Sequence, residues 1–100
     1  MFSKLKAGDK VIQRYVYYPV NTPDIHPTFG YKIVVIDFVA LSYLEYRTST
    51  FRVKGFTYSA KTGGITSNHS SHFKILPITD ENLALVKQTK DRMLLDLISS

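Results

Sequence analysis

One segment, residues 31–53, limits the possible folds of this chain more than any other part of it. It reads YKIVVIDFVALSYLEYRTSTFRV and begins with a run rich in the β-branched residues isoleucine and valine. A run of this length is too short for a buried helix and is typical of a strand buried on at least one face. Two shorter runs, residues 43–47 and 50–53, alternate apolar and polar side chains. We therefore predict a three-stranded meander.

One carboxylate sets the orientation of the first of these strands. Asp37 interrupts the apolar run of residues 33–39, and a lone carboxylate is costly to bury. Because successive side chains point to opposite faces of a strand, we expect Val34, Ile36 and Phe38 to face the core. A loop or the C-terminal helix should partly cover the other face. The same alternation directs one set of side chains inward, namely Leu44, Tyr46, Phe51 and Val53, and another set outward, namely Tyr43, Glu45, Arg47, Arg52 and Lys54.

Turn and capping residues mark the elements on either side of the meander. The Gly8-Asp9 turn precedes a β-branched and aromatic run at residues 11–18, which predicts a first strand. Residues 55–71 are dense in glycine, serine and threonine and predict a loop or an irregular hairpin tipped at residues 62–64. A short strand at residues 72–76 leads to a helix capped by Thr79.

These elements predict one domain of the mainly-β class with a C-terminal α-helix. A chain of 100 residues has enough length for a single core. We expect a small SH3-like five-stranded barrel over about residues 6–77 and the helix over about residues 79–98.

The predicted helix carries an apolar stripe at spacings of three and four residues, which we expect to pack on the barrel. The stripe consists of Leu83, Val86, Lys90, Met93, Leu94 and Leu97, with the aliphatic stem of the lysine in place of an apolar side chain. Leu85, Leu95 and Ile98 fall outside the stripe, so the apolar arc is wide. This surplus indicates either a homodimer or partner contact, or a helix lying deep across a barrel mouth. The second interpretation is favoured.

A proline-rich segment, residues 17–30, is the best candidate for a recognition surface. It reads YYPVNTPDIHPTFG, and its three prolines exclude a helix or a central strand. A loop of this length is uncommon in a compact chain unless it binds something. The candidate partner-binding residues are Tyr17, Tyr18, Ile25 and Phe29. An irregular connection, with Ile25 and Phe29 packed against the barrel, fits the same sequence equally well.

The outward side chains of the meander indicate a different partner. Tyr43, Arg47, Arg52 and Lys54 combine cations with an aromatic ring, as in surfaces that bind phosphates and stack bases. The net charge of +5 suits an acidic partner, although the basic residues are spread along the chain. Glu45 across from Arg52 or Lys54 would instead form an ordinary cross-strand ion pair.

Few residues support catalysis, metal binding or membrane insertion. The absence of cysteine excludes thiolate catalysis, disulfide bonds and cysteine-based zinc sites. His69 and His72 have no obvious third ligand, so we expect no metal and no other cofactor. A histidine-based ribonuclease, pairing His26 with His69 or His72 and using Lys61 at the phosphate, is an alternative that spacing alone does not exclude. No apolar run is long enough to cross a membrane.

Several motifs resemble those of small accessory proteins of tailed bacteriophages. They are Lys-x-Gly-Asp-Lys-Val (residues 6–11), Val-Ile-Asp-Phe-Val (35–39), Thr-Phe-Arg-Val (50–53) and His-Phe-Lys-Ile-Leu-Pro-Ile-Thr-Asp-Glu (72–81). The resemblance implies an SH3-like barrel with a C-terminal helix, expressed in the cytoplasm of an infected bacterium. It carries no functional residues onto this chain.

The sequence thus predicts a non-enzymatic binding protein. Our first interpretation is a protein-binding module, a phage accessory protein that binds a host or defence protein and inhibits or redirects it. The alternative is a nucleic-acid-binding barrel that uses the basic and aromatic face of the meander. Protein binding is preferred, because small barrels serve mostly as recognition scaffolds and the basic charge is spread rather than focused.

Overall fold

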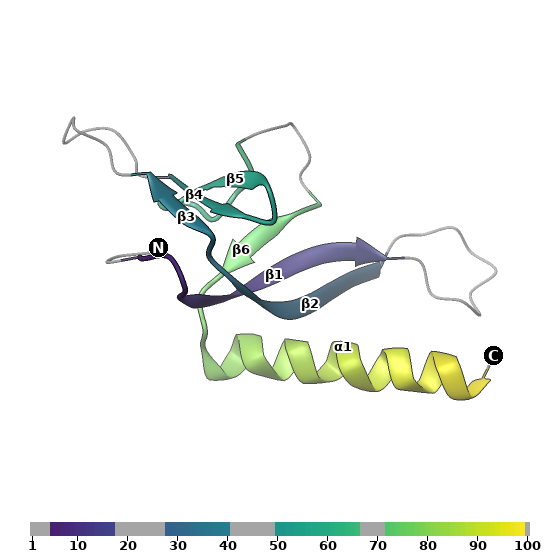
Figure 1. The fold of residues 1–100 in the computed structure, drawn as a ribbon. Coiled ribbons are helices and arrows are strands. Elements are labelled where there is room, and N and C mark those ends of the chain that lie inside the picture. Colours follow the sequence, from purple (N-terminus) through teal and green to yellow (C-terminus); the bar gives the residue numbers. More distant parts are fainter. Residues whose placement is uncertain (1–4, 18–27, 41–49, 67–71, 100) are drawn as a thin grey trace.

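A computed structural model of the protein describes residues 5–17, 28–40, 50–66 and 72–99. The strands in these residues form two antiparallel three-stranded sheets, and a helix follows the last strand (Figure 1). The first sheet has the order β2-β1-β6, and the second has the order β3-β4-β5. Along the chain the elements are β1 (Lys10–Tyr17), β2 (Thr28–Val35), β3 (Phe38–Ala40), β4 (Thr50–Val53), β5 (Phe56–Ser59), β6 (Lys74–Leu76) and α1 (Asp80–Ser99).

β1 and β2 form a long hairpin whose register fixes its two faces. Lys10 pairs with Val35, and Tyr17 pairs with Thr28. Residues that pair directly in an antiparallel sheet point to the same side. The face that we call the inner face therefore carries Val11, Gln13, Tyr15, Gly30, Lys32 and Val34.

The hydrophobic core lies between the inner face of the hairpin and the second sheet. Its buried side chains come from both sheets and are Val11, Val34, Ile36, Phe51, Val53, Tyr58, Ala60 and Ile75. Phe51 and Val53 are fully buried, which confirms the inward direction predicted for them. Nε2 of Gln13 donates a hydrogen bond of 3.2 Å to the phenolic oxygen of Tyr58, so this buried polar pair is satisfied within the core.

The chain passes from the first sheet to the second at Ile36 and Asp37. The amide of Ile36 donates to the carbonyl oxygen of Asp9 at 2.9 Å, and the amide of Asp37 donates to that of Arg52 at 2.9 Å. These bonds end one strand and start another, so the alternation of faces does not continue through the segment. The prediction that Phe38 faces the core is therefore wrong. Its side chain is 56% exposed, while Val39 packs against the core.

Strand β5 lies in the segment that was predicted as a loop or irregular hairpin. The turn between β4 and β5 consists of Lys54 and Gly55, whose φ angles are 51° and 86°. Two central residues with positive φ are the mark of the type I′ turn, whose twist matches that of the flanking strands. A second turn follows, in which the amide of Gly63 donates to the carbonyl oxygen of Ser59 at 2.7 Å. The high content of glycine, serine and threonine is typical of loops, and for this reason the strand between these turns was not predicted.

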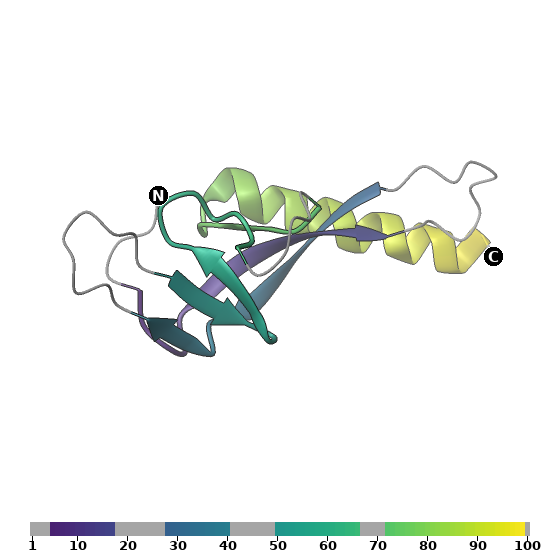
Figure 2. The same cartoon turned by 90° about the horizontal axis from the view of Figure 1, so that it is seen from above.

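The helix begins where the capping residue predicts. Oγ1 of Thr79 accepts a hydrogen bond of 3.1 Å from the amide of Asn82, and Asp80 and Glu81 occupy the first turn. This geometry confirms Thr79 as the N-cap. In Figures 1 and 2, α1 lies on the side of the hairpin away from the second sheet and crosses its strands at an angle.

The face of α1 that packs on the hairpin differs from the predicted stripe. Val86 and Thr89 are buried and Met93 is partly buried, at spacings of three and four residues. Leu94 and Lys90, however, are exposed. The wide apolar arc therefore does not place the helix deep across a barrel mouth, contrary to the favoured interpretation.

The described residues confirm a mainly-β fold with a C-terminal helix. They form two small sheets and no closed barrel. No helix in the described part of the chain has both the length and the hydropathy needed to cross a bilayer.

Candidate functional site

Two of the four predicted partner-binding residues, Tyr17 and Phe29, lie where β1 ends and β2 begins. We call this end of the two strands the hairpin tip. Tyr18 and Ile25 fall outside the described residues. Phe29 is exposed, and the guanidinium carbon of Arg14 lies 4.6 Å from the centre of its ring. A cation over an aromatic face is attractive, so Phe29 is held at the surface and is not packed into the core.

Helix α1 holds the hairpin tip along the free edge of β2. Nη2 of Arg92 donates to the carbonyl oxygen of Phe29 at 3.1 Å, and the amide of Tyr31 donates to Oγ1 of Thr89 at 3.0 Å. Among the described strands β2 is an edge strand, and none of them pairs with the backbone groups on its outer side. The helix supplies partners for two of these groups and so fixes the hairpin tip beside its own C-terminal half.

Tyr15 makes a second link between the hairpin and the helix. Its ring lies directly over Gly30, where an added Cβ would come within 2.6 Å of the ring carbon Cζ. Its hydroxyl donates to Sδ of Met93 at 3.9 Å. Burial raises the pKa of Tyr15, and the neighbouring Tyr17 raises it further while Arg92 opposes the change. The absence of a side chain at Gly30 therefore allows the tyrosine to reach across β2 to the helix.

The last two turns of α1 expose large apolar side chains. Between 57% and 72% of each of these side chains is exposed, and we call the set the helix patch: Leu94, Leu95, Leu97 and Ile98. Leu94 and Ile98 are four residues apart and therefore lie on one side of the helix. Lys90 lies one turn before Leu94 on that side and is exposed. Leu95 and Ile98 thus lie on the side of α1 opposite the buried Thr89, whereas Leu97 follows Met93 by one turn and lies on the packed side of the helix.

The helix patch and the hairpin tip lie at the same end of the molecule (Figures 1 and 2). In the sequence they are separate features, one in the proline-rich segment and the other more than sixty residues later. The hydrogen bond from Arg92 to Phe29 brings them together. We call the helix patch, Tyr17 and Phe29 together the hairpin–helix end, and it is the candidate partner-binding site of this chain.

The residues predicted to bind nucleic acid are described only in part. Arg52 and Lys54 are exposed, as expected, whereas Tyr43 and Arg47 fall outside the described residues. Lys32 projects from the inner face of the hairpin, where burial lowers its pKa first of all and the neighbouring charge of Lys54 contributes to lowering it further. Sequence reasoning did not find Lys32, because the register of the hairpin and the turn at Lys54 are both needed to bring the two lysines together.

Only one of the three histidines, His72, lies within the described residues. In that part of the chain, no three histidine or acidic side chains lie close enough together to hold a metal ion. His72 is exposed, while His26 and His69 fall outside the described residues. The ribonuclease alternative therefore stays a prediction.

Comparisons with known proteins do not assign this chain to a family. No family model, no curated protein and no solved structure matches the chain. The site is therefore interpreted from its own side chains.

Proposed function

We propose that this protein is a non-enzymatic protein-binding module whose contact surface is the hairpin–helix end. One observation carries the proposal: four large apolar side chains of α1 are exposed at the end of the molecule that also holds the tip of the hairpin. Apolar surface gains about 25 cal/mol for each Å² that is removed from water, so a partner that covers the patch is favoured. Several large apolar side chains exposed close together often mark interaction sites in soluble proteins.

The side chains around the helix patch indicate the kind of partner. Leu94 and Ile98 have the spacing of the anchors by which an amphipathic helix enters an apolar groove. Lys87 and Lys90 are exposed and precede the patch along the helix. We therefore expect a protein with an apolar groove and with carboxylates where the groove meets these two lysines.

The proposed biological setting comes from the resemblance described above. In that setting the chain is a phage accessory protein in the cytoplasm of a host bacterium, and its partner is a host or defence protein. The SH3-like five-stranded barrel belongs to the same proposal. It is supported by the two antiparallel sheets, whose buried side chains form one core.

Nucleic-acid binding is the alternative function, and it rests on Arg52 and Lys54, which are exposed. Because binding to phosphates releases counterions, such a complex weakens steeply as salt is added. Binding through the apolar helix patch depends much less on salt, and this difference separates the two functions.

An affinity experiment with the full chain tests the proposed function. Tagged protein is incubated with bacterial lysate at low and at high salt, with and without nuclease, and the retained material is identified by mass spectrometry. We expect a discrete protein that survives both treatments. Retention of nucleic acid alone, lost at high salt, would contradict the proposal and favour the alternative.

A second copy of the chain is another candidate partner for the helix patch, and it would form a homodimer through the C-terminal helix. Sedimentation of the purified chain, measured over a range of concentrations, distinguishes it from binding to a second protein. A monomer is expected when the partner is a different protein. A dimer that is lost on replacing Leu94 and Ile98 by glutamine would identify a second copy as the partner.

A further inference from the structure

Lys32 lies on the inner face of the hairpin and Lys54 in the β4–β5 turn, and neither belongs to the hairpin–helix end. The side chain of Lys54 is close enough for its charge to act on Lys32. We propose that this pair of lysines binds a phosphate-type oxyanion. The inference does not depend on the proposed function, because it concerns other residues and another ligand.

The backbone at Lys54 is the first observation that points to a ligand. Its φ of 51° lies in the left-handed region, which only a few per cent of residues other than glycine adopt. Asparagine and glycine are the residues that a type I′ turn prefers at this position. A carboxylate oxygen of Asp37 accepts a hydrogen bond of 2.7 Å from the amide of Lys54 and holds the turn in place. A lysine is thus kept where the fold prefers another residue, which is a mark of functional sites.

The placement of Lys32 is the second observation. Its ammonium lies 4.9 Å from the centre of the Tyr15 ring, on the inner face of the hairpin. Burial lowers the pKa of Lys32, and the neighbouring amine of Lys54 lowers it further. Both effects mean that a positive charge is held at this position at a cost in free energy.

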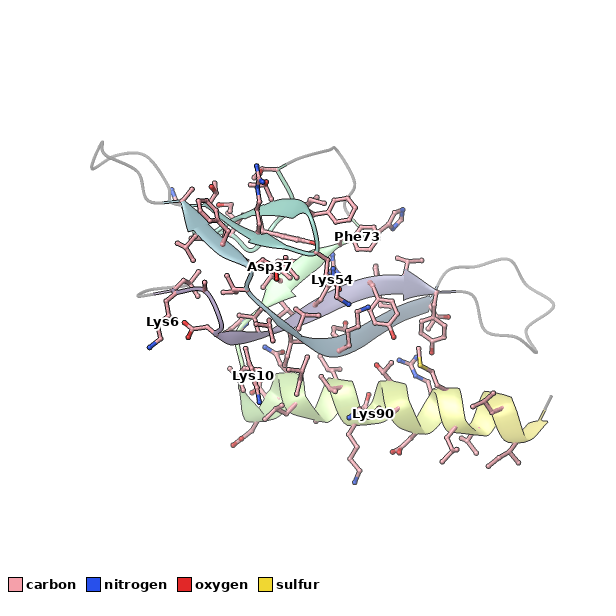
Figure 3. The ribbon with its side chains drawn as sticks, in the orientation of Figure 1. Lys6, Lys10, Asp37, Lys54, Phe73 and Lys90 are labelled. Carbon is pink, nitrogen blue, oxygen red and sulfur yellow. The ribbon has the colours of Figure 1, made fainter. Side chains whose placement is uncertain are left out.

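In the described residues, no carboxylate forms an ion pair with the ammonium group of Lys32 or of Lys54. Asp37 binds the backbone amide of Lys54 instead. The side chain of Lys54 extends from its turn toward the hairpin (Figure 3). Two adjacent ammonium groups with several free donors suit a single oxyanion, whose oxygens accept hydrogen bonds from both.

The position of Tyr15 indicates that the site recognises only the anionic group of a ligand. One face of the Tyr15 ring lies over Gly30, and Lys32 approaches the ring as well. The ring is therefore committed to contacts within the protein and is not free to stack on a base. Recognition here depends on the phosphate group, which either inorganic phosphate or the backbone of a nucleic acid can supply.

Titration calorimetry with inorganic phosphate, against chloride at equal ionic strength, tests the proposal. The key variant is Lys54→Asn, because asparagine suits the turn and keeps the fold while it removes one ammonium. Lys32→Gln removes the other. Lys10→Gln is the matched control, since it removes an exposed lysine at the start of β1 that lies outside the pair.

We expect phosphate to bind the wild-type chain and the Lys10→Gln variant alike. We expect it to bind the Lys54→Asn and Lys32→Gln variants at least about tenfold more weakly, a loss of about 1.4 kcal/mol for each factor of ten. Equal affinity in all four proteins, or no more heat with phosphate than with chloride, would overturn the proposal.

A second titration identifies the source of the phosphate. An oligothymidylate without terminal phosphates, if it binds the wild type but not Lys54→Asn, identifies a nucleic-acid backbone as the ligand. Binding of inorganic phosphate alone identifies a small phosphate compound. Both results support the oxyanion site, and neither bears on the partner expected at the hairpin–helix end.

Discussion

Lys54 shows how a single residue can be placed against its own conformational preference. Its left-handed backbone is stabilised by the following Gly55, by the hydrogen bond to Asp37 and by the β4–β5 pairing on either side. The turn therefore forms in spite of the lysine. The unfavourable conformation is the cost of directing an ammonium group toward Lys32.

Replacing Lys54 by asparagine should make the chain more stable. The variant creates an Asn-Gly type I′ turn and removes the positive charge of Lys54 beside Lys32. We therefore expect the free energy of unfolding to rise by up to about 1 kcal/mol. Urea denaturation of the wild type and the variant measures the change. Lys54→Ala is the control, because it removes the same charge but gains no turn preference. A variant with asparagine that is no more stable than the one with alanine would refute this explanation.

Tyr58 and Gln13 form a polar pair at the centre of the core. Tyr58→Phe leaves the buried amide of Gln13 without its partner, and the expected cost is about 1–3 kcal/mol. The double variant Tyr58→Phe with Gln13→Met should recover part of this loss, because no polar group then stays buried and unpaired. Denaturation of the two single variants and the double variant gives the coupling energy directly. Strict additivity would show that the hydrogen bond contributes nothing.

The same tyrosine predicts a dependence of stability on pH. Burial raises the pKa of Tyr58 above its ordinary value of 10.0, while the hydrogen bond with Gln13 opposes this change. A group with a raised pKa in the folded state contributes stability that is complete below pH 10 and is lost as the pH rises through the folded pKa. The stability difference between wild type and Tyr58→Phe should therefore shrink between pH 8 and pH 11. A constant difference over this range would contradict the assignment.

At the scale of elements, α1 stabilises the fold by covering an exposed strand edge. The hydroxyl of Thr89 accepts from the amide of Tyr31 and donates to the carbonyl oxygen of Leu85 at 2.9 Å. Thr89 is buried, so these bonds form away from solvent. A polar residue in the packed face of the helix is thus explained by the unpaired backbone of β2.

Replacing Thr89 by valine should destabilise the chain, because valine keeps the shape but removes the acceptor for the amide of Tyr31. The expected loss in the free energy of unfolding is about 1–3 kcal/mol. Thr89→Ser, which keeps the hydroxyl, is the matched control and should retain most of the stability. Amide hydrogen exchange at Tyr31 gives a local measure, and slow exchange that persists in the valine variant would argue against the bond.

The elements that the sequence predicted well are those decided by neighbouring residues. Thr79 caps the helix through a residue three positions away, and the alternation in residues 50–53 places Phe51 and Val53 inward. The elements that it predicted badly depend on distant partners. Phe38 turns outward because the strand is interrupted beside it by bonds to Asp9 and Arg52, and no local pattern reports those contacts.

At the scale of the whole molecule, the candidate sites arise from the way the two sheets and the helix are assembled. The sequence named Tyr17, Phe29 and Lys54, and it identified a surplus of apolar surface on the helix. It did not show that the hairpin tip and the helix patch share one end of the molecule, or that Lys32 lies beside Lys54. Both relations are set by strand register and by helix packing, which link residues far apart in the chain.

The central claim is that the hairpin–helix end binds a protein partner, and a variant comparison tests it most directly. The full chain, the double variant Leu94→Gln with Ile98→Gln, and the control Phe38→Gln serve as baits in nuclease-treated lysate at high salt. Phe38 is a suitable control because it is as exposed as Leu94 but lies in the second sheet. All three substitutions replace exposed side chains, so the fold should be preserved, and circular dichroism verifies this.

Quantitative mass spectrometry of the retained proteins gives the result. We predict a discrete protein that the wild type and Phe38→Gln retain equally and that the double variant retains at least about tenfold less, which corresponds to about 1.4 kcal/mol of lost binding free energy. A protein retained equally by all three baits, or retention by none of them under these conditions, would contradict the claim.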